Sequence, residues 1–96
     1  MLDFGDRRIM GCSRTDLERW VRELTGLQDR SFLADRLDLS DTGIPVCLVV
    51  RELAPRRIGL VSFAQLELWF DYPPDQADAA RDWIRRFDRH TQRGGG

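Results

Sequence analysis

The sequence contains no Lys and no Asn, and all 15 of its basic residues are Arg. Because Lys and Asn codons are rich in A and T, this composition indicates a GC-rich bacterial genome rather than selection of Arg for phosphate or carboxylate contacts. The 16 acidic residues leave a formal net charge of −1. Both signs are mixed along the chain, so we expect no overall attraction to nucleic acid or to a membrane.

Cysteines and long apolar runs are also scarce. The two cysteines, Cys12 and Cys47, cannot form the disulfide framework of a small secreted domain, and we expect both thiols to be reduced. No segment approaches the roughly 18 uninterrupted apolar residues of a membrane-spanning helix, and the first residues lack a signal-peptide pattern. The sequence therefore predicts a cytoplasmic protein.

The motifs that hold common cofactors are missing. Neither a Gly-x-Gly-x-x-Gly stretch nor a phosphate-binding loop occurs, and the single histidine, His90, has no zinc-type spacing to the two distant cysteines. We therefore expect no cofactor and no metal site. His90 is interpreted as a cation near the C-terminal end of a helix.

One polar segment, residues 38–43, invites two motif readings. As a calcium-binding loop it fails, because Val49 stands where a Glu must complete the calcium shell. Asp38, Ser40 and Gly43 also resemble the Asp-x-Ser-x-x-Gly signature of PilZ domains, but the Arg-x-x-x-Arg motif of that family is missing upstream of them. A capped turn between two strands is the preferred interpretation.

What the chain does contain is enough apolar sequence for one core. The 96 residues are 42% hydrophobic, and the apolar residues recur in periodic runs, which predicts one folded domain over residues 1–91. Residues 92–96 read as a flexible Gly-rich tail.

Two segments have the apolar spacing of helices. The first begins at Ser13, which forms a capping box with Asp16, and ends at Gly26; its apolar residues are Leu17, Trp20, Val21 and Leu24. The second begins near Pro74, and its apolar stripe comprises Ala77, Ala80, Trp83, Ile84 and Phe87.

The strands are predicted from alternation and β-branched content. Residues 33–39 suggest an edge strand, and residues 45–53 suggest a central strand covered on both faces. A turn at residues 54–57 then leads into a strand over residues 58–70, with a bulge near residues 62–64. The alternative for residues 62–70 is a short helix capped by Ser62. Residues 2–10 suggest a short strand, or a hairpin that turns at Gly5-Asp6.

These elements predict an α+β fold. We expect a small antiparallel sheet of three or four strands with two helices packed on one face, as in a ferredoxin-like plait or a related two-layer sandwich.

The function that this sequence suggests is protein binding without catalysis. We expect a protein partner or self-association, in the form of a homodimer or of an immunity or antitoxin-type inhibitor, and no nucleic acid, membrane or metal partner. Aromatic and Arg side chains are the candidate binding residues: Trp69, Tyr72, Trp83, Arg81, Arg85 and Arg89.

Two alternatives come from other functional classes. Cys12 precedes a helix and lies close in sequence to several arginines, a setting that lowers the pKa of a thiol and suits a small thiol-dependent enzyme or redox protein. Arg81, Arg85 and Arg89 share one helix face and suit nucleic-acid binding, although Asp residues alternate with them, which favours a solvated ion-pair face.

Overall fold

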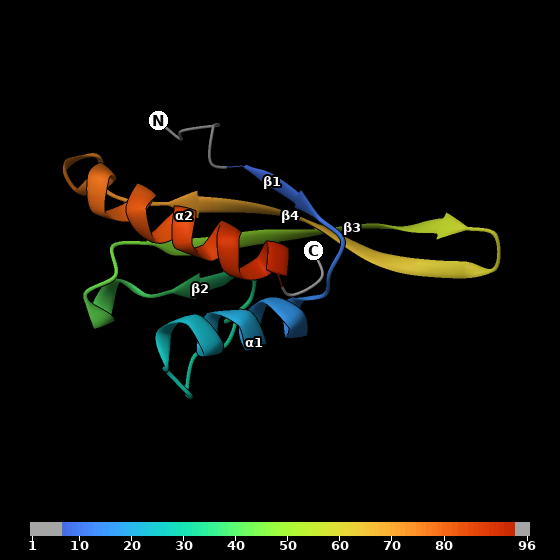
Figure 1. The fold of residues 1–96 in the computed structure, drawn as a ribbon, viewed down its shortest axis with the longest axis horizontal. Coiled ribbons are helices and arrows are strands. Elements are labelled where there is room, and N and C mark those ends of the chain that lie inside the picture. The colour runs from blue at the N-terminus through green and yellow to red at the C-terminus, as the bar shows by residue number, and fades with distance from the viewer. Residues whose placement is uncertain (1–6, 94–96) are drawn as a thin grey trace.

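A four-stranded antiparallel sheet and two α-helices form the computed structural model of the protein, which describes residues 7–93 (Figure 1). The elements follow one another as β1 (Arg8–Met10), α1 (Arg14–Thr25), β2 (Arg36–Asp38), the 3₁₀ turn η2 (Ser40–Thr42), β3 (Cys47–Ile58), β4 (Val61–Asp71), the 3₁₀ turn η3 (Pro74–Gln76) and α2 (Ala77–Arg93). The predicted fold class is confirmed. Three consecutive strands precede α2, so the element order is that of a related two-layer sandwich rather than of the ferredoxin-like plait.

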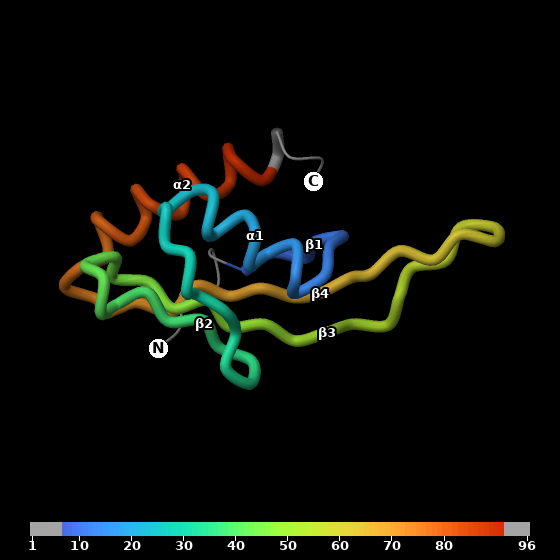
Figure 2. Tube along the Cα trace, turned by 90° about the horizontal axis from the view of Figure 1, so that it is seen from below, coloured from blue at the N-terminus to red at the C-terminus, as the bar shows by residue number. Residues whose placement is uncertain are grey.

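The sheet has the strand order β1-β4-β3-β2, and both helices lie on one of its faces (Figure 2). β3 and β4 are the central strands, whereas β1 and β2 are edge strands of three residues each. No helix of residues 7–93 covers the opposite face, so the predicted cover on both faces of the central strand is wrong. We call it the open face; on it Val49 is only half-buried.

Helix α1 has the predicted boundaries and caps. The Ser13 hydroxyl accepts a hydrogen bond from the Asp16 amide at 3.2 Å, and the Asp16 carboxylate accepts one from the Ser13 amide at 3.1 Å. The reciprocal bonds satisfy two amides that the helix itself leaves unpaired. Gly26 ends the helix with a φ of 76°, a left-handed conformation that glycine adopts without strain.

The core lies between the helices and the sheet. Phe87 of α2 is fully buried, with its ring centroid 5.2 Å from that of Phe70 and 5.7 Å from that of Trp83. The predicted apolar faces of the two helices and the central strands supply most of the other buried side chains: Leu17, Trp20, Val21, Leu48, Val50, Leu66, Leu68, Ala80 and Ile84. α2 continues through Gln92 and Arg93, which the sequence suggested as tail; residues 94–96 and the turn suggested at Gly5-Asp6 lie outside the described residues.

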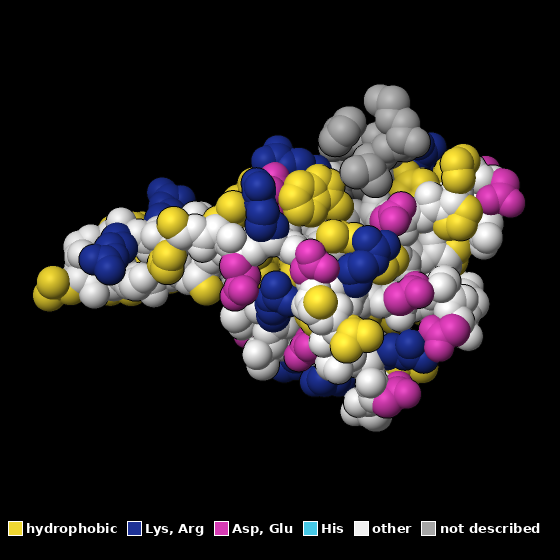
Figure 3. Space-filling model, turned by 180° about the vertical axis from the view of Figure 1, so that it is seen from behind, with side chains coloured by type: hydrophobic (Ala, Val, Ile, Leu, Met, Phe, Trp, Pro, Cys, Tyr) yellow, Lys and Arg dark blue, Asp and Glu magenta, His cyan; other side chains and the backbone are white. Residues whose placement is uncertain are grey.

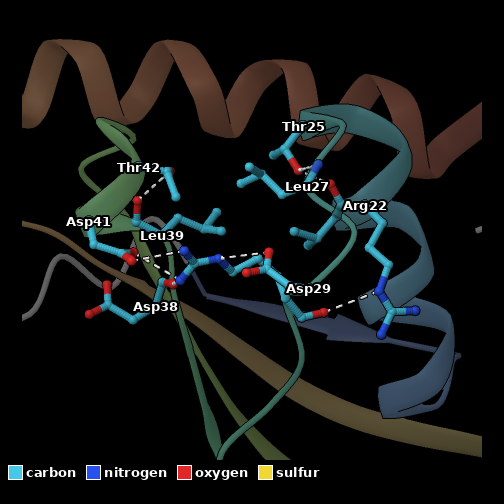
Figure 4. Close-up of polar contacts among 10 residues, drawn as sticks. Arg22, Thr25, Leu27, Asp29, Asp38, Leu39, Asp41 and Thr42 are labelled. Atoms are coloured by element: carbon cyan, nitrogen blue, oxygen red, sulfur yellow. Dashed lines mark hydrogen bonds and ion pairs between the residues drawn. The ribbon is translucent and has the colours of Figure 1, made fainter.

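The segment 38–43 forms the predicted turn between strands. The Asp38 carboxylate accepts a hydrogen bond from the Ser40 amide at 2.9 Å, and Gly43 closes the turn with a φ of 90°. Arg30, from the loop after α1, donates two hydrogen bonds to the Asp41 carboxylate at 2.9 and 2.8 Å (Figure 4). Arg22 in turn donates to the Arg30 carbonyl oxygen at 3.2 Å. These contacts connect the two loops at this end of the domain, so the polar residues have a structural role here.

The hairpin of β3 and β4 differs from its prediction. β3 continues past Pro55 as one strand. Its register against β4 shifts between Leu53 and Arg56, so the bulge lies here rather than at residues 62–64. Pro lacks an amide proton and is tolerated at a bulge. The chain turns four residues later, at Gly59, whose φ of 62° suits the first position of a two-residue hairpin turn. Residues 61–71 form a strand, so the alternative short helix is wrong.

Candidate interaction surface

The most exposed feature of the molecule is the distal half of this hairpin, residues 54–64, which we call the arm. It projects beyond the helices and beyond both edge strands, and it accounts for the long dimension of a molecule that measures 46 × 30 × 26 Å (Figures 1 and 2). β1 pairs with β4 only over Leu66–Leu68, and β2 pairs with β3 only over Cys47–Val49. Among residues 7–93, no strand pairs with the outer edges of the arm.

The arm carries large apolar side chains in contact with solvent. The exposed fraction is 57% for Ile58, 105% for Leu60, 52% for Val61 and 48% for Phe63. In an antiparallel ladder, directly opposite residues point to the same side of the sheet. Ile58 pairs with Val61 and Arg56 pairs with Phe63, so one face of the arm carries three large apolar side chains together with Arg56. Contiguous exposed apolar patches are typical of protein or membrane interaction sites, of ligand-binding grooves and of aggregation-prone surfaces.

The arm is also basic. Arg56 and Arg57 are the only charged residues between positions 54 and 64, and the next acidic residues along the chain are Glu52 and Glu67. The space-filling view of the open face shows this distribution, with hydrophobic and Arg side chains on the arm and mixed charges on the body (Figure 3). The arm has a formal charge of +2. Because the net charge of the chain is −1, the other residues together carry −3.

The open face of the sheet adjoins the arm. Along β4, side chains alternate between faces, and Trp69 lies on the open face, where its side chain is partly buried. The guanidinium carbon of Arg51 lies 5.9 Å from the Trp69 ring centroid. A shallow hollow of about 250 Å³ borders the ring and is lined by Arg36, Val49, Trp69 and Asp71.

A buried carboxylate occupies the middle of the open face. Glu67 is only 2% exposed and accepts hydrogen bonds from Arg7 on one side and from Arg51, at 2.7 Å, on the other. Burial by itself raises the pKa of Glu67, but the hydrogen bonds and charges of the two arginines outweigh burial. The pKa of Glu67 is therefore lower than its usual value.

This shift predicts acid sensitivity of the folded state. Because the folded pKa of Glu67 lies below its unfolded value, the ionised group stabilises the fold at neutral pH, and this contribution disappears as the pH falls through the folded pKa. We expect Glu67→Gln to lower the urea midpoint at pH 7 and to differ progressively less from the wild type below pH about 4. Urea unfolding from pH 7 to pH 3 measures this effect. Glu23→Gln, at an exposed carboxylate of α1, is the control; an equal response of both variants would contradict the assignment.

The structure separates the binding residues that the sequence suggested. Trp69 lies on the open face, whereas Trp83 is 6% exposed and packs against Phe70 and Phe87, so its assignment as a binding residue is corrected to a core residue. Its burial follows from its place on the apolar stripe of α2. Tyr72 is half-buried, packs against the core and lines a second hollow of about 340 Å³ together with residues of β2 and the β2–β3 connection.

The three arginines of α2 that the sequence suggested as binding residues lie away from Trp69. Arg81, Arg85 and Arg89 are exposed on the helix layer, on the opposite side of the sheet from the open face. Arg85 lies 3.4 Å from the Asp82 carboxylate. The arginines and Trp69 therefore do not form one surface.

Cys12 has a different environment from the one that its sequence neighbours suggested. Its side chain is 5% exposed and belongs to the core. Burial, followed by the nearby charge of Asp16, raises the pKa of the Cys12 thiol to about 11. The predicted lowering of the Cys12 pKa by nearby arginines is therefore wrong.

The predicted turn at residues 54–57 is wrong, because β3 continues through these residues to Ile58, and the sequence prediction therefore does not include the arm. Two local signals mark it: Gly59, the residue suited to a tight hairpin turn, and the absence of acidic residues between Glu52 and Glu67.

Comparisons of the chain with protein-family models, with curated proteins and with solved structures found no match. Within the described part of the chain, no helix is long and apolar enough to cross a membrane. Residues 7–93 also contain no group of three or more His, Cys, Asp and Glu side chains placed to hold a metal ion.

Proposed function

We propose that this protein is a protein-binding module that acts through the arm. The observation that carries the proposal is the set of four large apolar side chains, each about half or more exposed, on a hairpin that stands outside the core. A two-stranded hairpin is only marginally stable in water, so these side chains add little to folding. Binding of a partner that covers them is favoured by a free energy of roughly 25 cal/mol for each Å² of apolar surface removed from water.

The free strand edges and the charge of the arm add to this argument. Unpaired backbone amides and carbonyls on both sides of a hairpin can extend the sheet of a partner. The two arginines favour an acidic partner surface. An immunity or antitoxin-type inhibitor is one form of such a module. The many Asp residues of the chain suggest a toxin with a basic surface as the target, whereas the basic arm suits an acidic target better.

Site-specific photo-crosslinking tests the proposal. Benzoylphenylalanine in place of Leu60, in the full chain and in extracts of the cells that make it, is expected to give discrete protein adducts. The same probe in place of Ala79, an exposed residue of α2, is the matched control. Adding Phe63→Ser to the Leu60 probe should reduce the adducts severalfold. Equal adduct patterns from both probe positions, or no adduct from position 60, would contradict the proposal.

A further inference from the structure

We infer that the partner of the arm is a second copy of this chain, and that the two arms pair edge to edge along β4. This inference rests on the proposed function, because it uses the arm as the binding surface, and it adds the identity of the partner and the edge that receives it. In this pairing Ser62 lies opposite Ser62 of the other copy, on a two-fold axis perpendicular to the sheet. The two hairpins then form one antiparallel sheet with the two β4 strands at its centre.

The two outer edges of the arm differ in their capacity to pair. The β3 edge carries Pro55, which has no amide proton, followed by the charged residues Arg56 and Arg57. Proline and charge are the features by which proteins protect a free edge from further pairing. On the β4 edge, residues 61–65 contain no Pro, no Gly and no charged residue. An uncharged segment without these breakers is suited to strand pairing, so β4 supplies the edge that binds.

The backbone of β4 presents free groups at this edge. A two-residue turn joins Ile58 to Val61, and the closing hydrogen bond of such a turn directs the Val61 amide toward β3. Backbone groups alternate along a strand, so the amides and carbonyls of Ser62 and Ala64 face outward. With Ser62 on the axis, each Ser62 amide donates to the Ser62 carbonyl of the other copy. The contact thus has two reciprocal hydrogen bonds at its centre.

The position of β1 sets the register of the two copies. β1 pairs with β4 from Leu66 onward, and Met10 is the partner of Leu66. With Ser62 on the axis, the turn of each copy ends beside residues 64 and 65 of the other, before this edge is occupied. A centre at Phe63 would instead bring Leu60 of the copy to the level of Leu66, where Met10 already lies. The axis at Ser62 therefore leaves room for both strands.

The bodies of the two copies lie apart in this arrangement. Each arm projects from its body, so antiparallel arms place the bodies at opposite ends (Figure 1). Leu66 of the copy falls at the level of Ile58, eight residues from Leu66 of the first copy, which corresponds to about 26 Å along the strand. The pairing consequently uses the arms alone and needs no contact with the open face.

The facing side chains are apolar or neutral. Val61 falls opposite Phe63 of the other copy on each side of the axis, and pairs of a β-branched and an aromatic residue stabilise antiparallel sheets. Leu60 falls beside Ala64. Both arginines of each arm belong to β3, the outer strand of the combined sheet. The two copies of Arg57 are three strand spacings apart, about 14 Å, which exceeds the screening length of roughly 8 Å at physiological ionic strength.

The pairing closes with two copies. It uses the unprotected edge of both arms, and the edges that remain outside are the two β3 edges with Pro55 and the arginines. A strand of a different protein could accept the same hydrogen bonds, but it would have to bring an uncharged extended segment of its own. A second copy supplies such a segment in matching register, and we therefore favour it over a different protein.

Analytical ultracentrifugation of the full chain over micromolar to high-micromolar concentrations tests the inference. The wild type is expected to form a dimer. Ser62→Pro should raise the dimer dissociation constant at least about tenfold, because it removes both amides on the axis. Arg57→Pro is the matched control, since Arg57 is the ladder partner of Ser62 on the opposite edge, and it should leave the dissociation constant unchanged. A dimer that Ser62→Pro leaves intact, or that both variants weaken equally, would overturn the edge pairing.

Disulfide crosslinking locates the axis without a proline. Directly opposite residues of a hydrogen-bonded pair have Cα atoms about 5.5 Å apart, within the range that a disulfide spans. Oxidation with copper phenanthroline should therefore link Ser62→Cys into dimers at least about tenfold faster than Arg57→Cys. Cys12 and Cys47 are buried, so the introduced thiol dominates the reaction. Equal rates for the two variants would contradict the pairing. Circular dichroism and urea unfolding confirm that each variant retains the fold.

Three further results also overturn the inference, and they separate it from the proposed function. A monomer at every concentration that still forms adducts from position 60 with a different protein refutes the second copy but retains the binding function of the arm. A monomer without such adducts refutes both. A monomer that floats with vesicles of phosphatidylcholine and phosphatidylserine, and that loses flotation when Leu60 is replaced by Ser, identifies lipid as the occupant instead.

Discussion

Phe87→Ala is expected to lower the free energy of unfolding by about 3 to 5 kcal/mol, because it removes a fully buried ring from the centre of the core. The remaining cavity would lie between α2 and the sheet, where the rings of Phe70 and Trp83 lose their contacts with Phe87. The free energy of unfolding of a native protein is about 5 to 15 kcal/mol, so the substitution should remove a large fraction of it. Urea unfolding followed by Trp fluorescence measures the change.

Leu60→Ala is the control for this experiment, because it truncates an apolar side chain of similar chemistry at the tip of the arm. Leu60 is 105% exposed, so its removal should change the stability of the isolated chain by less than about 0.5 kcal/mol. A Phe87→Ala variant as stable as Leu60→Ala would show that α2 does not pack on the sheet as described.

Cys12 is expected to react with iodoacetamide at neutral pH more than two orders of magnitude more slowly than an ordinary thiol. Only the thiolate reacts, and a pKa of about 11 leaves roughly one thiol in ten thousand ionised at pH 7, against about three in a hundred for a reference thiol. Burial of the side chain slows the reaction further. Peptide mapping by mass spectrometry after timed alkylation from pH 7 to pH 10 gives the rate for each cysteine separately.

The pH profile distinguishes a buried thiol from an activated one. A rate that rises about tenfold per pH unit up to pH 10 matches the raised pKa of Cys12, and in urea both cysteines should react at the ordinary rate. A fast reaction that is already constant near pH 7 would contradict the described environment and would favour the thiol-dependent alternative. Cys47 is a useful comparison, because burial also raises the pKa of that thiol.

Much of the fold follows from local sequence patterns. The capping box of Ser13 and Asp16, the glycine at position 26 and the apolar stripe that includes Phe87 all act within a few residues, so they predict both helices. Alternation along residues 66–70 likewise identifies the core face of β4. The layer order then follows, because both helices must bury their apolar stripes against the sheet.

The errors cluster where the outcome depends on distant residues. Pro55 is a frequent turn residue, but here it lies at a bulge, and the turn follows at Gly59. Trp69 and Trp83 look equivalent in sequence, yet one lies on the open face and the other in the core. The arginines near Cys12 in sequence predict a lowered thiol pKa, whereas burial in the folded core raises it.

The candidate binding site likewise combines local features, which the sequence predicts, with features that depend on distant residues. The helices, the inward faces of the strands and the basic, acid-free composition of residues 54–64 can be read from the amino-acid sequence, because propensity, periodicity and charge are local properties. That these residues form a projecting arm depends on the tertiary structure, since their exposure is set by where β1, β2 and the helices end. Burial is a property of all the chain segments around a residue, and neighbours along the chain alone do not supply it.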